Sequence, residues 1–173
     1  VYVQGVGGTG TSNWVGPVTF TMPLSNDSTC NAIDLAVDGT TYTFDNSGAT
    51  TQANEGTIAP PTTGFQTSDG WGDSNIDFTT WFTFTAPASG NMNLSGLVEG
   101  FDGQFAVYEA TDCSDMNTFT LVGANDDALD GTSGAPDFSI CGLTPGNTYY
   151  LMHDSWSTVT TGVYSIQLDE IVT

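Results

Sequence analysis

Hydrophobic and polar positions alternate in short runs along most of this chain, and no stretch keeps apolar residues at helical spacing. The runs are rich in β-branched and aromatic residues and are separated by Gly, Asn, Asp and Pro, a pattern typical of strands joined by turns. The predicted strands are Val18–Met22, Ala32–Val37, Thr40–Phe44, Thr80–Thr85, Asn91–Leu97, Gln104–Glu109, Thr118–Val122, Asp137–Leu143, Thr148–His153 and Val163–Leu168. Such regular spacing predicts an all-β fold, an antiparallel β-sandwich of jelly-roll-like type with no significant helix.

Two segments lack this alternation of hydrophobic and polar residues. Asn46–Asp77 is a long stretch of Gly, Thr, Pro, Asn and Ser, and Ala124–Pro136 is shorter and acidic. A loop as long as the first is either functional or poorly ordered in a compact domain. The second has the composition of a loop that carries a site on a rigid scaffold, but a plain solvated turn has the same composition.

The charge of the chain excludes several kinds of partner. Among 173 residues there are 20 Asp and Glu, one His and no Lys or Arg, which gives a formal net charge of −20. Without cationic side chains the chain cannot neutralise a phosphate backbone, so we expect no nucleic-acid partner. Anionic membrane surfaces would repel it, and its apolar runs are too short for membrane insertion. Inorganic cations are therefore its natural counter-charge.

Several motifs resemble the bacterial pre-peptidase C-terminal domain family. The aromatic strand that starts at Trp81 runs into the turn Ala86-Pro87-Ala88-Ser89-Gly90, and the segment Gly142–Tyr150 precedes the penultimate strand. Shorter matches are Asn26-Asp27 before Cys30, Phe101-Asp102-Gly103, and Asn125-Asp126-Asp127. The resemblance covers roughly residues 25–171. It implies a β-sandwich that serves as an accessory module of secreted enzymes and adhesins and that, in several kinds, binds calcium.

The first 23 residues resemble a different family. Val1-Tyr2-Val3 and the run Trp14–Thr21 are similar to the last two strands of a fibronectin type III module. The domain boundaries expected are thus a hairpin over 1–23, a possible remnant of a preceding module, and a sandwich over 24–173. Alternatively, the hairpin covers an edge strand of the main sandwich, because an isolated hairpin is marginal in water. Either way, we expect a fragment of a multidomain extracellular or cell-surface protein.

Two groups of oxygen-bearing side chains are candidates for calcium, which takes six to eight oxygen ligands. The first group is expected to converge if the strands Gln104–Glu109 and Thr118–Val122 form a hairpin. It comprises Asp102, Asn125, Asp126, Asp127 and Asp130. The second group follows from the resemblance, in which an acidic entry segment and acids ahead of the aromatic strand share an ion. It comprises Asn26, Asp27, Asp73 and Asp77. The alternative for both groups is ordinary, solvated turns.

Carbohydrate binding by exposed aromatic residues is the second functional hypothesis. Trp71 and Trp156 lie in predicted loops among Asp, Gly and Ser, where flat aromatic faces could contact a glycan. The alternative is that these tryptophans cap the ends of the sandwich. In that reading the chain would be a carbohydrate-binding accessory domain of a secreted hydrolase.

The three cysteines, Cys30, Cys113 and Cys141, match no zinc-binding pattern, and two of them are expected to form a disulfide in an extracellular compartment. The residues alone leave all three pairings open. The family resemblance implies Cys113–Cys141, with Cys30 free or paired elsewhere.

Catalysis by the chain itself is not expected. His153 is the only histidine, its neighbour Asp154 points to the opposite face of a strand, and no nucleophile elbow is present, so the sequence offers no typical catalytic arrangement. We therefore expect a non-enzymatic, calcium-stabilised structural or adhesive module. Its expected partners are neighbouring modules of the same chain or assembly, and a glycan or a surface protein.

Overall fold

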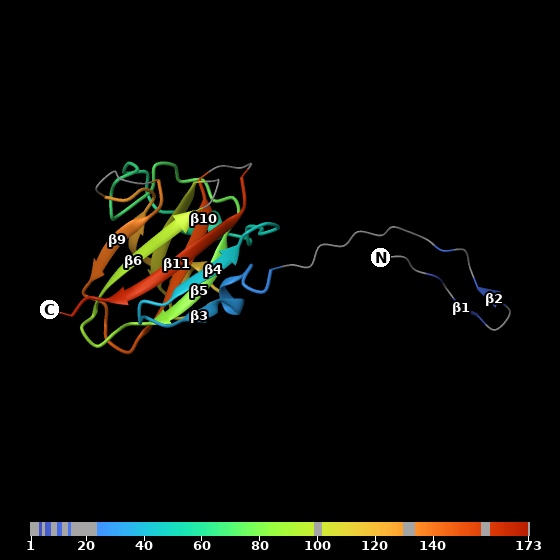
Figure 1. The fold of residues 1–173 in the computed structure, drawn as a ribbon, viewed down its shortest axis with the longest axis horizontal. Coiled ribbons are helices and arrows are strands. Elements are labelled where there is room, and N and C mark those ends of the chain that lie inside the picture. The colour runs from blue at the N-terminus through green and yellow to red at the C-terminus, as the bar shows by residue number, and fades with distance from the viewer. Residues whose placement is uncertain are drawn as a thin grey trace.

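The computed structural model describes residues 4, 6–7, 10–11, 14, 24–98, 102–129, 134–156 and 160–172. Two β-sheets face each other and form a sandwich (Figure 1). The predicted all-β sandwich is therefore confirmed. None of the helices in the described part of the chain is long and apolar enough to cross a membrane.

The larger sheet has five strands in the order β3-β5-β10-β7-β8. These strands are β3 (Ile33–Leu35), β5 (Thr80–Thr85), β10 (Thr148–Ser155), β7 (Gly103–Glu109) and β8 (Thr120–Asn125). All pairs are antiparallel except β3 and β5, which are parallel. The central position of β10 brings the C-terminal quarter of the chain between strands that precede it by about 40 to 70 residues.

The smaller sheet has four antiparallel strands in the order β4-β11-β6-β9. They are β4 (Thr41–Asp45), β11 (Val163–Glu170), β6 (Asn91–Val98) and β9 (Asp137–Cys141). A separate two-stranded pair joins β1 (Val6–Gly7) to β2 (Gly10–Thr11). The predicted strand Val18–Met22 lies outside the described residues, so the boundary after residue 23 stays a prediction.

Short 3-10 helices are the only helical elements in the described ranges: η1 (Thr29–Asn31), η2 (Glu55–Ile58) and η3 (Met116–Thr118). The last of these corrects one strand boundary. The side chain of Asp115 accepts a hydrogen bond from Asn117 N and caps η3, so β8 starts at Thr120 rather than at Thr118.

The space between the sheets holds the main hydrophobic core. Because alternate residues of a strand point to opposite faces, Phe82 and Phe84 of β5 pack inward with Leu151 of β10 and Ile166 of β11. The single histidine, His153, is also fully buried in β10, where its ring stacks on Tyr164 at a centroid distance of 3.6 Å. Burial lowers the pKa of His153 to about 3.

A second apolar cluster covers the outer face of the five-stranded sheet. It comprises Trp71, Trp81, Ala106, Tyr108, Met116, Phe119, Ala124 and Met152. The long segment predicted as a loop over Asn46–Asp77 supplies Trp71 and also the fully buried Glu55, whose carboxylate accepts a hydrogen bond from Trp81 Nε1 at 2.6 Å. The long loop is therefore a structural cover, and it buries the second face of the sheet.

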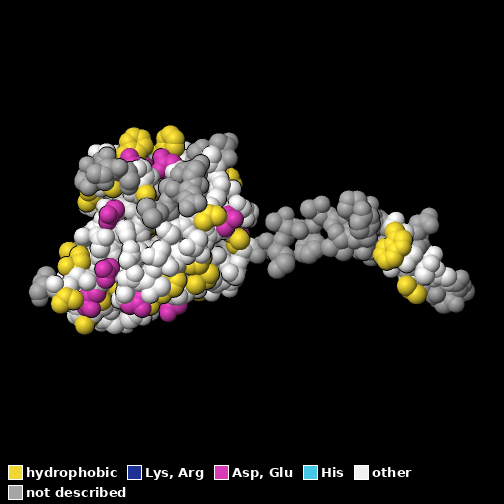
Figure 2. Space-filling view, viewed as in Figure 1, with side chains coloured by type: hydrophobic (Ala, Val, Ile, Leu, Met, Phe, Trp, Pro, Cys, Tyr) yellow, Lys and Arg dark blue, Asp and Glu magenta, His cyan; other side chains and the backbone are white. Residues whose placement is uncertain are grey.

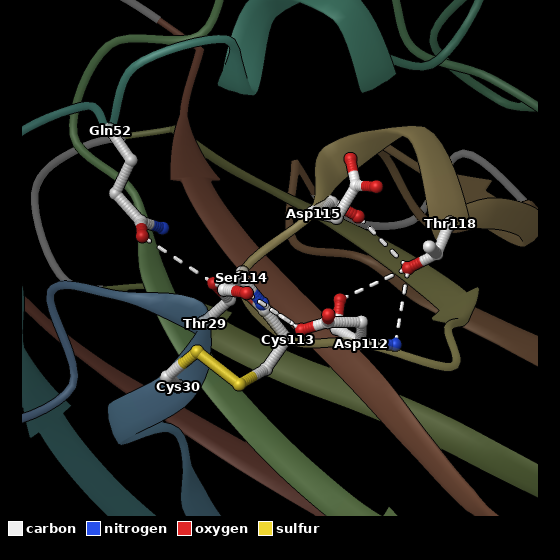
Figure 3. Close-up of a disulfide and its surroundings, with 8 residues drawn as sticks. All are labelled: Thr29, Cys30, Gln52, Asp112, Cys113, Ser114, Asp115 and Thr118. Atoms are coloured by element: carbon white, nitrogen blue, oxygen red, sulfur yellow. Dashed lines mark hydrogen bonds between the residues drawn. A yellow bond between two sulfur atoms is a disulfide. The ribbon is translucent and has the colours of Figure 1, made fainter.

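The disulfide joins Cys30 to Cys113, so the expected Cys113–Cys141 pairing is wrong. Figure 3 shows that the bond links η1 to the turn that follows β7, where Thr29 Oγ1 also donates to the carbonyl of Cys113 at 2.6 Å. Cys141 is free and exposed at the end of β9 in the other sheet. The sheet order separates Cys141 from Cys113, and this order depends on long-range pairing.

Candidate metal centre

Three carboxylates converge at one end of the five-stranded sheet. Asp102 directly precedes β7, and Asp126 and Asp127 directly follow β8. Because Phe105 pairs with Asn125 across these antiparallel strands, the three side chains meet, and one ligand atom of each lies within 4.8 Å of the others. Among the described residues this is the one group of three acidic side chains that converges in this way.

Two of these carboxylates carry buried oxygens that find no hydrogen-bond donor among the described residues. Asp126 is fully buried, and its Oδ2 accepts a hydrogen bond from Gly72 N at 2.9 Å, but its Oδ1 has no such partner. Asp102 Oδ1 is buried without a partner as well. Unpaired buried acceptors are costly, and a bound cation would satisfy both oxygens at once.

The electrostatics of the group show the same deficit of positive charge. Burial, together with the charges of Asp102, Asp127 and Asp73, raises the pKa of Asp126 to about 7 against the effect of the hydrogen bond from Gly72 N. Burial, together with the charge of Asp127, raises the pKa of Asp102 to about 6, and burial also raises the pKa of Asp127. The chain has no Lys or Arg to offset these charges, and Figure 2 shows acidic side chains on its surface with no basic one among them.

Gly72 allows the close approach of chain segments around the group, whereas Gly134 lies beside the group with ordinary room for a Cβ. At Gly72 an added Cβ would lie 2.3 Å from the ring of Phe65 and 2.8 Å from Asp126 Oδ2. At Gly134 it would lie 3.5 Å from Asp127 Oδ1 and 3.9 Å from Asp102 Oδ1. The backbone of residue 72 is thus wedged between an aromatic ring and a carboxylate, and only Gly fits there without rearrangement.

Asn125 braces the surrounding loops. Its Nδ2 donates to the carbonyls of Thr67 and Asp127, each at 2.6 Å, and its Oδ1 accepts from Asp137 N at 2.9 Å. The side chain of Asn125 therefore holds the acidic loop in place, while Asp102, Asp126 and Asp127 present the ligand atoms. Asp130 lies outside the described residues.

The four residues of the second predicted group have the contacts given below, and their convergence on one ion stays a prediction. Asp27 accepts hydrogen bonds from Thr50 N and Thr50 Oγ1, each at 2.6 Å, and the carbonyl of Asn26 accepts from Trp81 N. Burial raises the pKa of Asp77, and the charge of Asp73 adds to this effect. Since Asp73 also acts on Asp126, its carboxylate belongs to the surroundings of the Asp102 group.

Sequence reasoning missed a buried carboxylate that positions the loop beside this group. Asp154 is fully buried in β10, and its carboxylate accepts from Phe78 N at 2.8 Å, Asp77 N at 3.1 Å and Gln104 Nε2 at 3.2 Å. Burial raises the pKa of Asp154 to about 7 against the effect of these donors. The sequence does carry a signal for the direction of this side chain. Asp154 follows Met152 by two residues, so both side chains point to the outer face of β10.

The two candidate tryptophans have different environments. Trp71 is fully buried, and its Nε1 donates to the carbonyl of Phe105 at 2.9 Å, so the expectation that it presents a glycan-binding face is wrong. The cause is the long loop, which folds Trp71 onto the sheet. Trp156 is 38% exposed, and its ring lies beside that of Phe65, with 6.2 Å between the ring centroids.

Without divalent cations, we expect the free energy of unfolding to rise as the pH falls from about 7.5 to about 4.5. The pKa of Asp126 is raised in the folded state, so the folded protein keeps a proton that the unfolded chain has already lost in this range. This contribution is complete below the unfolded pKa and disappears as the pH rises through about 7. Asp102 and Asp154 act in the same direction.

Urea unfolding in EDTA at constant ionic strength would measure this slope. Asp126→Asn should flatten it, since each group protonated only in the folded state contributes at most about 1.4 kcal/mol per pH unit. Equal slopes in the two proteins would contradict the role of Asp126.

No protein-family model matches the sequence, and no curated protein matches it. Among solved structures, the chain is similar to the pre-peptidase C-terminal domain of a collagenase from Bacillus anthracis, at 16% identity and a TM-score of 0.40, with 80% of this chain and 94% of that chain covered. This is the family that the sequence motifs resemble.

Two further solved structures are similar at lower identity. A periplasmic inhibitor of g-type lysozyme from Aeromonas hydrophila is 12% identical, with a TM-score of 0.40 and coverage of 80% of this chain and 96% of that one. A surface-associated copper-binding protein of Methylomicrobium album BG8 is 8% identical, with a TM-score of 0.43 and coverage of 81% and 99%.

Proposed function

We propose that this chain is a non-enzymatic, calcium-binding module that works outside the cytoplasm in a structural or adhesive role. The observation that carries the proposal is the convergence of Asp102, Asp126 and Asp127 around buried carboxylate oxygens that lack donors. Such a group, in a chain without Lys or Arg, calls for a cation.

Calcium fits these ligands better than other common metal ions. Carboxylate oxygens in irregular geometry suit calcium, whereas zinc prefers nitrogen and sulfur, and magnesium demands near-octahedral geometry. Bound calcium would tie the start of β7 to the end of β8, and through Gly72 N it would also hold the long loop.

The disulfide and the buried histidine support the rest of the proposal. The Cys30–Cys113 bond fits an oxidising compartment, such as the cell surface or its surroundings. His153 is packed against Tyr164 in the core and is therefore unsuited to acid–base catalysis. Neighbouring modules of the same assembly, or a surface protein, are the partners that such a module would join.

Calorimetric titration with calcium tests this function directly. We expect one site with a dissociation constant on the order of 10⁻⁴ to 10⁻³ M, as in extracellular calcium modules, and weaker binding of magnesium. Asp126→Asn should weaken calcium binding about tenfold or more, because it removes the charge of the most buried ligand.

Asp137→Asn is the matched control, because Asp137 is an exposed aspartate on β9 that bonds to Asn93 and lies outside the three-carboxylate group. It should bind calcium like the wild type. The proposal would be abandoned if calcium up to about 10 mM gave neither binding heat nor a rise in melting temperature.

A further inference from the structure

Two exposed aromatic side chains lie at the edge of the acidic group. Phe65 is 46% exposed and Trp156 is 38% exposed, and their ring planes are tilted by 58°. We call this pair the aromatic rim. Large aromatic side chains usually bury most of their surface, so a pair of them in solvent contact beside a polar centre is a candidate binding surface.

Backbone contacts attach the aromatic rim to the carboxylate residues. Asp127 N donates to the carbonyl of Phe65 at 2.9 Å, and Trp156 N donates to the carbonyl of Asp102 at 3.1 Å. The ring of Phe65 also lies against Gly72, whose N–H holds Asp126. The positions of both rings are therefore coupled to the residues that would hold calcium.

The three carboxylates supply at most the minimum number of oxygen ligands that calcium takes. They offer at most six oxygens, and Asp126 Oδ2 already accepts a hydrogen bond from Gly72 N, whereas calcium takes six to eight ligands. Asp102 and Asp127 are only partly buried, so a cation between them would be reached from solvent. Counting only the side chains that the structure describes, coordination positions beyond these oxygens remain for water or for oxygens of a ligand.

We infer that this combination binds a neutral sugar in a calcium-dependent manner. Two vicinal hydroxyls would complete the coordination of the cation, and the apolar face of the sugar ring would lie on the aromatic rim. This inference rests on the proposed calcium site.

The charge of the chain restricts the ligand class. An anionic sugar or a phosphate would face a net charge of −20 with no Lys or Arg to pair with. A peptide bearing Lys or Arg would occupy the carboxylates in place of calcium, so its binding would weaken when calcium is added. A neutral sugar is the ligand for which calcium increases affinity.

The test is a neutral glycan array in calcium and in EDTA, followed by calorimetry with the soluble hexasaccharides of glucose and mannose. We expect calcium-dependent binding to at least one neutral glycan. Trp156→Ala should weaken it about tenfold or more, while the calcium-induced rise in melting temperature remains. Trp14→Ala, the same substitution at a tryptophan that is 64% exposed, is the matched control and should change neither.

The other possible results distinguish a failure of the sugar site from a failure of the calcium site. A calcium-induced rise in melting temperature without binding to any neutral glycan would overturn the sugar site and leave the calcium site standing. Glycan binding that persists in EDTA, or that is unchanged in Trp156→Ala, would place the ligand elsewhere and also overturn it. If calcium neither binds nor stabilises the protein, both proposals fail.

Discussion

Replacing Cys30 and Cys113 with serine is expected to lower the free energy of unfolding by about 4.5 kcal/mol, the chain-entropy value for a loop of this length. The disulfide spans a sequence separation of 83 residues, from η1 to the turn after β7. Without it, the unfolded chain regains the entropy of that loop. The melting temperature should then fall by about 10 to 15 °C for a chain of this size.

Cys141→Ser is the control for this experiment, because Cys141 is free and exposed on β9. It should leave the urea midpoint of the wild type nearly unchanged. A loss of stability in Cys141→Ser as large as that in the Cys30 and Cys113 double variant would mean that Cys141 takes part in the native disulfide.

Trp71→Ala is expected to cost about 3–5 kcal/mol of stability, the range typical of large aromatic residues removed from a core. Trp71 is fully buried between the long loop and the outer face of the five-stranded sheet. Its loss leaves a cavity there and removes the donor to the carbonyl of Phe105. Because the Trp71 side chain bonds the long loop to the sheet, the loop should detach locally before the sandwich unfolds.

Urea unfolding and hydrogen exchange would measure the two effects. Trp156→Ala is the matched control, since that tryptophan is partly exposed and should cost less than about 1 kcal/mol. If Trp71→Ala were as mild as Trp156→Ala, or if protection of the loop were unchanged, the long segment would not depend on Trp71 as its anchor.

The strands and the acidic group could be predicted because their signals are local. Alternation with a period of two depends only on the residues of each strand, so β5, β6, β7 and β10 appear close to their predicted bounds. Asp102 and Asp126 flank two successive strands, and a hairpin between such strands is the common connection. Their convergence therefore followed from neighbouring elements alone.

The environment of Asp73 and Asp154 could not be predicted in the same way. Asp73 is expected to share an ion with Asp27 and Asp77, and its charge raises the pKa of both Asp77 and Asp126. Asp154 is placed beside Gln104 and Phe78 by the insertion of β10 between β5 and β7. No local pattern marks that insertion, because it joins segments that are far apart in the sequence.

The sequence by itself determined the fold class, the absence of basic side chains and the site at which β7 and β8 present their acids. Only the tertiary structure decided which cysteines meet, that Trp71 is a core residue, and which aromatic side chains border the acidic group. The physical reason is that sheet order and the path of the long loop arise from contacts across more than 30 residues. Alternation, turns and charge are properties of each segment alone.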